Sequence, residues 1–228
     1  MSADELWTRP RRKEQQPALS RAQIVAAAVR LLDAEGIEAL SMRRLGTGMG
    51  AAATSLYRHV ASKDELIERV VDEVYGELDV PEAASAAEWR DAVSRSGHGL
   101  RAMALRHPWL ASLLGQAGLA YRGPNLMRMS ERMLALFRTA GFPANEADLA
   151  MKTVVSYVVG ATTGEAAHLS LLARSGRPAA RQALAEHPLP AEGHAAQEGR
   201  DPRKLRKENF DYGLQRVLDG LEARLGHG

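Results

Sequence analysis

The stretch SMRRLGTGMGAAATSLYRHVASK, residues Ser41–Lys63, decides the fold of the N-terminal part of the chain. Leu45 and Met49 are apolar and four residues apart, as are Leu56 and Val60. This spacing gives two short helices an inward face each. A glycine lies between the two pairs and suits a turn with positive φ. Two short helices joined by such a turn form a helix-turn-helix unit, whose second helix fits the major groove of DNA.

Capping residues place a helix on each side of this unit. Ser20 with Gln23 matches a capping box that opens the first helix, and Ser62 with Glu65 matches another that opens the fourth. We expect the helix before Ser62 to run over about 52–60. A helix-turn-helix DNA-binding domain is therefore predicted over residues 19–65.

The remainder of the chain, residues 66–228, also shows only helical periodicity. The fourth helix is predicted to stop at Pro81, and Ser85 with Glu88 forms a third capping box that opens the next helix. A Pro- and Gly-rich stretch predicts a long loop over 173–203. No segment alternates with a period of two, so the predicted fold class is all-α: a three-helix N-terminal head followed by a larger helical domain.

Composition limits the class of protein. The chain has 228 residues, 45% of them hydrophobic and 25% charged, as in a globular protein with a sizeable core. Cysteine is absent, which excludes disulfides and fits a cytoplasmic location. The N-terminus has no apolar signal-peptide core, and no apolar run is long enough to span a membrane.

Positive charge is concentrated near the N-terminus. Ten Lys and Arg stand against six Asp and Glu through Lys63, although the whole chain carries a net charge of only +2. Four basic residues fall within Arg9–Lys13, in a segment without a periodic apolar face. Residues 1–18 therefore read as a mobile basic arm, and the local excess of charge favours a polyanionic partner.

The order of helices and motifs resembles the tetracycline-repressor (TetR/AcrR) family of bacterial transcriptional regulators. The resemblance is strongest over residues 20–70 and extends, more weakly, over 85–226. The motifs that carry it are Ala34-Glu35-Gly36, Ser41-Met42-Arg43-Arg44-Leu45, Ser55-Leu56-Tyr57-Arg58-His59-Val60, Ser62-Lys63, His107-Pro108-Trp109, Gly123-Pro124-Asn125, Ala140-Gly141-Phe142, Phe210-Asp211-Tyr212-Gly213-Leu214 and Leu218-Asp219-Gly220-Leu221.

This resemblance implies a ligand-responsive repressor that binds double-stranded DNA. The expected molecule is a homodimer on a pseudo-palindromic operator, with a ligand-binding and dimerisation domain after the head. A small, largely apolar effector would release the operator. The resemblance implies that Arg43 reads a base edge. It implies that the residues facing the groove are Ala53, Thr54, Ser55 and Tyr57. The residues at positions that contact phosphate, or orient against it, are Tyr57, Arg58, His59 and Lys63.

The chain departs from the family pattern at several positions. Gly46 stands where an alanine is usual, and Gly48 adds a second glycine to the same helix. Alanine at 51, 52 and 53 leaves few hydrogen-bond donors for base edges, so DNA shape and methyl contacts would contribute to specificity. The histidine that precedes the Gly-Pro turn in tetracycline-binding members is replaced, so no metal–tetracycline ligand, metal site or cofactor is expected.

Candidate residues for the effector and for the dimer lie in the C-terminal domain. Several Met and aromatic residues suit an adaptable apolar cavity, with ordinary core packing as the alternative: Met103, His107, Trp109, Met133, Phe137 and Tyr157. The dimer interface is expected on the last two long helices, unless their apolar faces are used within one chain. Its candidate residues are Gly160, Gly164, Leu214, Val217, Leu218 and Leu221.

Other function classes have less support. A small-molecule or protein-interaction module with degenerate DNA reading is the main alternative, suggested by the alanine-rich recognition helix. The chain has no G-x-S-x-G, H-E-x-x-H or P-loop motif, so an enzyme is not expected. Residues 46–51 match a G-x-G-x-x-A nucleotide fingerprint, but capped helices flank them where that fingerprint needs a preceding strand.

Overall fold

The structure is a computed structural model that describes residues 19–110, 113, 123–173 and 201–226. The predicted arm over 1–18 and most of the predicted loop over 173–203 lie outside these residues. Every regular element in the described part is a helix, which confirms the all-α prediction. None of these described helices is both long and apolar enough to cross a membrane.

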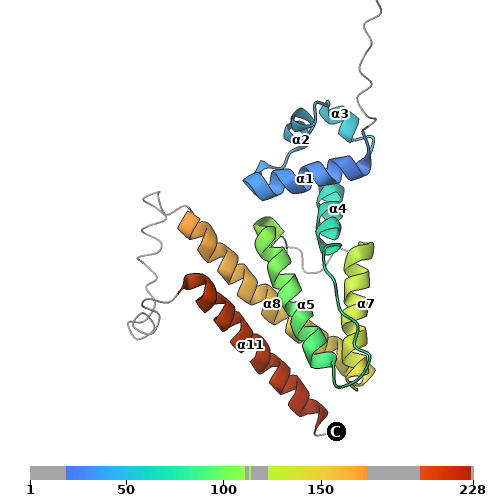
Figure 1. Ribbon diagram of the computed structural model, residues 1–228. Helices are drawn as coiled ribbons and strands as arrows, with labels where there is room; N and C mark the ends of the chain where they lie inside the picture. Colours follow the sequence, from blue (N-terminus) through green and yellow to red (C-terminus); the bar gives the residue numbers. More distant parts are fainter. Residues whose placement is uncertain (1–18, 111–112, 114–122, 174–200, 227–228) are drawn as a thin grey trace, which may run out of the picture.

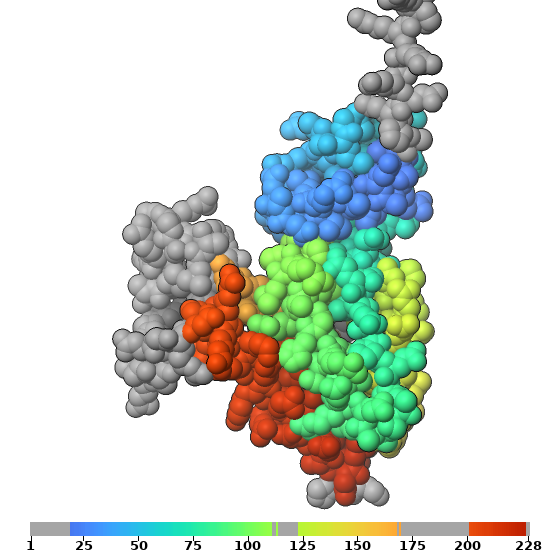
Figure 2. Space-filling view, viewed as in Figure 1, coloured from blue at the N-terminus to red at the C-terminus, as the bar shows by residue number. Residues whose placement is uncertain are grey.

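The N-terminal head contains four short elements and stands as a lobe above the rest of the molecule (Figures 1 and 2). The elements are α1 (Arg21–Glu35), η2 (Ile37–Ala39), α2 (Met42–Gly48) and α3 (Ala53–Leu56). Their apolar faces meet in a small core. Its most buried side chains are Ile24, Ala28, Leu32, Leu45 and Leu56.

The N-terminal caps of α1 and of the fourth helix form much as the sequence predicts. Ser20 and Gln23 make the complete capping box of α1. At the start of the fourth helix, Ser62 accepts a hydrogen bond from the backbone of Glu65, and the Glu65 carboxylate accepts one from the Ala61 N–H at 2.5 Å. This backbone hydrogen bond, with Arg69 beside it, holds the pKa of Glu65 below its usual value.

The helix predicted over about 52–60 is shorter than expected. α3 ends at Leu56, and residues 57–59 form a turn. The apolar spacing of Leu56 and Val60 indicated a longer helix, and both side chains are indeed buried. They are brought together by backbone hydrogen bonds of the turn, with the N–H groups of His59 and Val60 both donating to the Leu56 carbonyl.

Helix α4 (Lys63–Tyr75) joins the head to the larger domain. It packs against α1 at one end and against α7 at the other. The helix ends at Tyr75, before the predicted stop at Pro81, because the Gly76 N–H closes the last turn on the carbonyls of Asp72 and Glu73.

In its described residues, the larger domain is built from four long helices. These are α5 (Trp89–Arg106), α7 (Pro124–Thr139), α8 (Ala144–Ala173) and α11 (Pro202–Leu225). α8 lies at the centre and packs against the other three (Figure 1). α5 begins at Trp89, four residues later than predicted from Ser85; the Glu88 carboxylate still accepts a bond from the Ala84 N–H at 3.0 Å.

Candidate nucleic-acid interface and internal cluster

The side chains predicted to contact DNA come from α2, α3, the turn after α3 and the first residue of α4. Arg43 lies in the first turn of α2 and is exposed. Thr54 is exposed on α3, while Ala53 and Ser55 are half-buried. Tyr57 is 51% exposed, which is unusual for a large aromatic side chain and leaves its hydroxyl free to reach a partner.

Three of these positions carry a cation that faces solvent. Arg43, Arg58 and Lys63 are exposed, and none of them forms an ion pair within the described part of the chain. By contrast, Arg44 pairs with Glu35. Lys63 opens α4, where free backbone N–H groups add partial positive charge. The head therefore offers cations without ion pairs, among the described residues, to a polyanion.

His59 has a structural position. It is half-buried, and its carbonyl oxygen accepts a hydrogen bond from the Nε of Arg21 at 3.0 Å. This bond ties the turn after α3 to the start of α1. The backbone at His59 thus helps to hold the turn that carries Tyr57 and Arg58.

The two glycines of α2 differ in what they do. A Cβ at Gly46 would lie 2.7 Å from the carbonyl oxygen of Ala51, so only glycine fits this close approach. A Cβ at Gly48 would meet nothing within 4 Å. Gly50 has φ +67 and makes the turn toward α3. Gly46, which stands where the family usually has alanine, therefore leaves room for the tight turn that follows α2.

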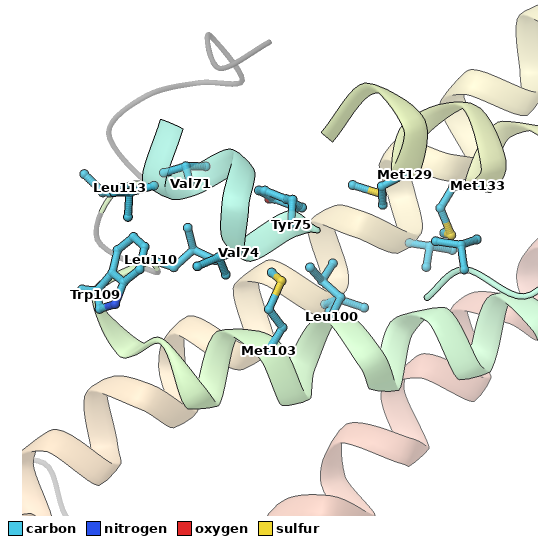
Figure 3. Close-up of a cluster of buried hydrophobic side chains, with 14 of the residues drawn as sticks. Val71, Val74, Tyr75, Leu100, Met103, Trp109, Leu110, Leu113, Met129 and Met133 are labelled. Atoms are coloured by element: carbon cyan, nitrogen blue, oxygen red, sulfur yellow. The ribbon is translucent and has the colours of Figure 1, made fainter. Parts of the chain in front are cut away.

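Below the head, α4, α5 and α7 enclose a cluster of apolar side chains (Figure 3). Those labelled in the figure are Val71, Val74, Tyr75, Leu100, Met103, Trp109, Leu110, Leu113, Met129 and Met133, each no more than 9% exposed. A neighbouring cavity, lined in part by Leu100, Met129 and Met133, has a volume of only about 10 Å³. That is space for about one water molecule.

Tyr75 contributes a phenol to this apolar cluster. Its side chain comes from the last turn of α4 and is 5% exposed (Figure 3). Burial raises the pKa of Tyr75 to about 12, so the hydroxyl stays neutral and can donate a hydrogen bond. No described residue forms a hydrogen bond with that hydroxyl. Among the described residues it is a polar group in otherwise apolar surroundings.

The structure separates the six residues predicted to bind an effector. Met103 and Met133 lie in the cluster of Figure 3. Phe137 packs with Trp89 and Phe142 in an aromatic group at the opposite end of α5 from the head. Tyr157 lies between α8 and α11, where its hydroxyl donates to the Phe210 carbonyl at 2.9 Å.

His107 and Trp109 connect the core to the head. The Nδ1 of His107 lies 2.7 Å from the Asp33 carboxylate on α1, and its Nε2 lies 3.1 Å from the Glu77 carboxylate after α4. The Nε1–H of Trp109 donates to the same Asp33 oxygen at 2.7 Å. Although burial acts in the opposite direction, hydrogen bonds from Arg106 and His107 hold the pKa of Glu77 below its usual value.

The predicted dimer residues divide into two groups. Leu214 and Leu218 are fully buried within the chain, so their side chains are not available to a second copy. The α11 face that carries them packs on α5 and α8 because its leucines recur at the spacing of an inward stripe. Val217 and Leu221 are half-buried, whereas Gly160 and Gly164 are exposed with open space around each.

Three residues that hold the junction together were not predicted from the sequence: Asp33, Asp72 and Glu77. Each is an acidic residue on or just after a helix, where the usual expectation is a solvated side chain. A partial signal existed for Asp72. Its partner helix α7 starts with Gly123-Pro124 and has no side-chain cap of its own. In the structure Asp72 supplies the cap that α7 lacks.

Two family models together match most of the chain. Residues 24–70 match the bacterial regulatory proteins of the tetR family, and residues 81–225 match the tetracyclin repressor-like C-terminal domain. An HTH-type transcriptional regulator from Saccharopolyspora erythraea is 36% identical, with 97% of this chain and 92% of that protein covered.

Further relatives agree with these matches. The HTH-type transcriptional repressor DrrR1 of Streptomyces coeruleorubidus is 32% identical, with 96% of this chain and 83% of that protein covered. The TetR family protein ActR of Streptomyces coelicolor, solved in complex with actinorhodin, has a TM-score of 0.71 and 30% identity over 91% of this chain and 97% of that one. The chain therefore belongs to the tetR family of bacterial regulatory proteins.

Proposed function

We propose that this chain is a ligand-responsive transcriptional repressor that binds operator DNA as a homodimer in the bacterial cytoplasm. One observation carries the proposal: the head presents Arg43, Arg58 and Lys63 as exposed cations without ion pairs in the described residues, at the positions where the family contacts DNA. The relatives of this chain include a transcriptional repressor. The interaction-module alternative is therefore not favoured.

Within the head, we assign the reading of a base edge to Arg43 and phosphate contacts to Tyr57, Arg58 and Lys63. Arg43 lies at the start of α2 and can reach a guanine edge with two donors. Ala53 and Thr54 on α3 offer a methyl surface and a hydroxyl to the groove. With so few donors, much of the sequence preference comes from DNA shape.

The effector site is the apolar cluster between α4, α5 and α7 (Figure 3). Its thioethers from Met103, Met129 and Met133 can adapt to an apolar ligand, and the Tyr75 hydroxyl supplies one hydrogen bond. The cavity beside it is far smaller than the roughly 300–1,000 Å³ of a typical ligand pocket. An effector must therefore displace side chains that include Val74 and Tyr75 of α4, the helix that carries the head.

The dimer interface that best fits the structure is the exposed face of α8 and α11. On α8 it is an uncharged stripe at helical spacing, namely Leu149, Thr153, Ser156, Gly160, Gly164 and Ala167. The stripe extends over roughly 27 Å. On α11 the side chain of Tyr212 is 69% accessible in one chain. Small residues allow a second pair of helices to approach closely and complete a four-helix bundle.

Selection of bound duplexes from a randomised library, followed by salt titration, tests the proposal. We expect a pseudo-palindromic consensus and affinity that falls steeply with salt. Lys63→Ala should reduce the slope of log K against log salt by about 0.9 per protomer. Lys204→Ala removes the same charge from exposed α11 and serves as the control. Recovery of no preferred sequence, or equal slopes for both variants, would count against DNA recognition by this head.

A further inference from the structure

Helix α4 and helix α7 cap each other. The Asp72 carboxylate on α4 accepts hydrogen bonds from the backbone N–H groups of Asn125 and Leu126, at 2.9 and 3.0 Å. In return the Asn125 side-chain amide donates to the Asp72 carbonyl at 3.0 Å, in the last turn of α4. α7 has no side-chain cap of its own, so Asp72 replaces the missing N-cap from another helix.

Electrostatics favour this arrangement. The first turn of α7 has N–H groups without intrahelical partners and carries partial positive charge, and the last turn of α4 carries partial negative charge. Asp72 adds a full negative charge at the positive end of α7. The two helix ends therefore stabilise each other only while they are in register.

Glycine permits the close approach of α4 and α7 at both helix ends. At Gly123, an added Cβ would overlap the Asp72 carboxylate, and at Gly76 it would lie 3.0 Å from the amide nitrogen of Asn125. The φ of Gly123 is −77, which any residue adopts. Glycine is thus required at 123 for space and not for backbone conformation.

From this geometry we infer that the reciprocal cap of Asp72 and Asn125 is a latch that fixes the position of the head-bearing helix α4 relative to the core. The inference rests on the proposed function, because the position of α4 sets that of the DNA-binding head. An effector that displaces Val74 and Tyr75 moves the turn of α4 next to Asp72. Hydrogen bonds at 2.9–3.0 Å do not survive a shift of that turn by an ångström or more, so the latch has two discrete states, closed and open.

The absence of cysteine permits a direct test. Glu38→Cys, at an exposed position of η2, places one nitroxide on each head of the homodimer, and pulsed electron paramagnetic resonance then measures the head-to-head distance. In this background Asp72→Ala should broaden the distance distribution. The amide in Asp72→Asn accepts the same bonds and should keep it narrow. Glu73→Ala removes a neighbouring exposed carboxylate from α4 and is the matched control.

Gly123→Ala gives an independent perturbation. Its methyl group displaces the Asp72 carboxylate without changing Asp72 itself, so its distance distribution should broaden as for Asp72→Ala. Affinity for the duplex selected on the wild-type protein should fall about fivefold in both variants, the usual size of a lost cap. Glu73→Ala should retain wild-type values in both measurements.

Several outcomes would overturn the latch. A lowered melting temperature for Asp72→Ala with an unchanged distance distribution and unchanged affinity would mean that the cap is only structural. A broad distribution for Asp72→Asn would show that hydrogen-bond acceptance is not the cause. Because the distance measurement needs no DNA, failure to select a duplex would reject the proposed function and leave the result on the latch standing.

Discussion

Replacement of His107 by alanine tests whether the junction between head and core is energetically coupled. His107 is 6% exposed and bridges Asp33 on α1 and Glu77 after α4. One ring nitrogen lies 2.7 Å from the Asp33 carboxylate, and the other lies 3.1 Å from the Glu77 carboxylate. Alanine removes both contacts and the buried ring.

The size of the stability loss in His107→Ala depends on how exposed its two partner carboxylates are. Hydrogen bonds to charged groups contribute about 1.5–3 kcal/mol each when shielded from water. The Asp33 and Glu77 side chains are 33% and 39% exposed, so water replaces part of each lost bond. We therefore expect the free energy of unfolding to fall by about 2 kcal/mol for the two lost hydrogen bonds, reduced for their exposure to water, and by about 1 kcal/mol for the lost burial of the ring. The melting temperature should fall by about 6–12 °C.

A double-mutant cycle with Asp33→Ala isolates the interaction. Urea unfolding followed by circular dichroism should give a coupling free energy of about 1–2 kcal/mol between the two substitutions. Glu38→Ala removes an exposed carboxylate from the same head and should combine additively with His107→Ala. A coupling below about 0.5 kcal/mol in the Asp33 cycle would refute a direct link between α5 and α1 through this side chain.

Three further predictions concern the core and the dimer. Because the pKa of Tyr75 is raised to about 12 from 10, the protein should lose about 3 kcal/mol of stability between pH 10 and 12, with full stability below pH 10; denaturant titrations should show a much smaller loss in Tyr75→Phe. Gly160→Arg places a long cation on the uncharged stripe of α8 and should yield monomers in sedimentation velocity, whereas a stable dimer would exclude that face. Gly213→Ala should destabilise the contact between α8 and α11 by about 1–3 kcal/mol, because its methyl group overlaps the Tyr157 ring. Tyr157→Ala in the same chain should relieve the overlap, so the double variant should be more stable than the sum of the two single losses predicts. Additive losses of stability in thermal melts would contradict the contact between Gly213 and Tyr157.

The helices and their class could be predicted because their signals are local. The capping residues Ser20 and Ser62 each bond to a backbone N–H three positions later, and the apolar spacing within each helix is visible without the fold. The family motifs assigned DNA contacts to Arg43 and Lys63, and both residues are exposed in the structure.

The functional contacts between helices could not be predicted in the same way. Asp33 and His107 lie 74 positions apart, and Asp72 and Asn125 lie 53 apart, with no local pattern that pairs them. The apolar stripe with Leu214 and Leu218 likewise had two possible partners, a second copy or the chain's own core. The sequence does not distinguish these, because both partners bury the same leucines with the same spacing.

The continuity of α4 limits how heads can be exchanged between relatives. Leu66 and Val70 lie on the half of α4 nearer the head, whereas Val74 and Tyr75 lie in the core cluster, so a graft joined within α4 must satisfy both sets of neighbours. Transplanting residues 19–76 as a unit would also carry Asp33 and Asp72 away from the His107, Trp109 and Gly123 that recognise them. A functional chimera therefore needs acceptor residues matched to those two carboxylates, in addition to a well-placed joint.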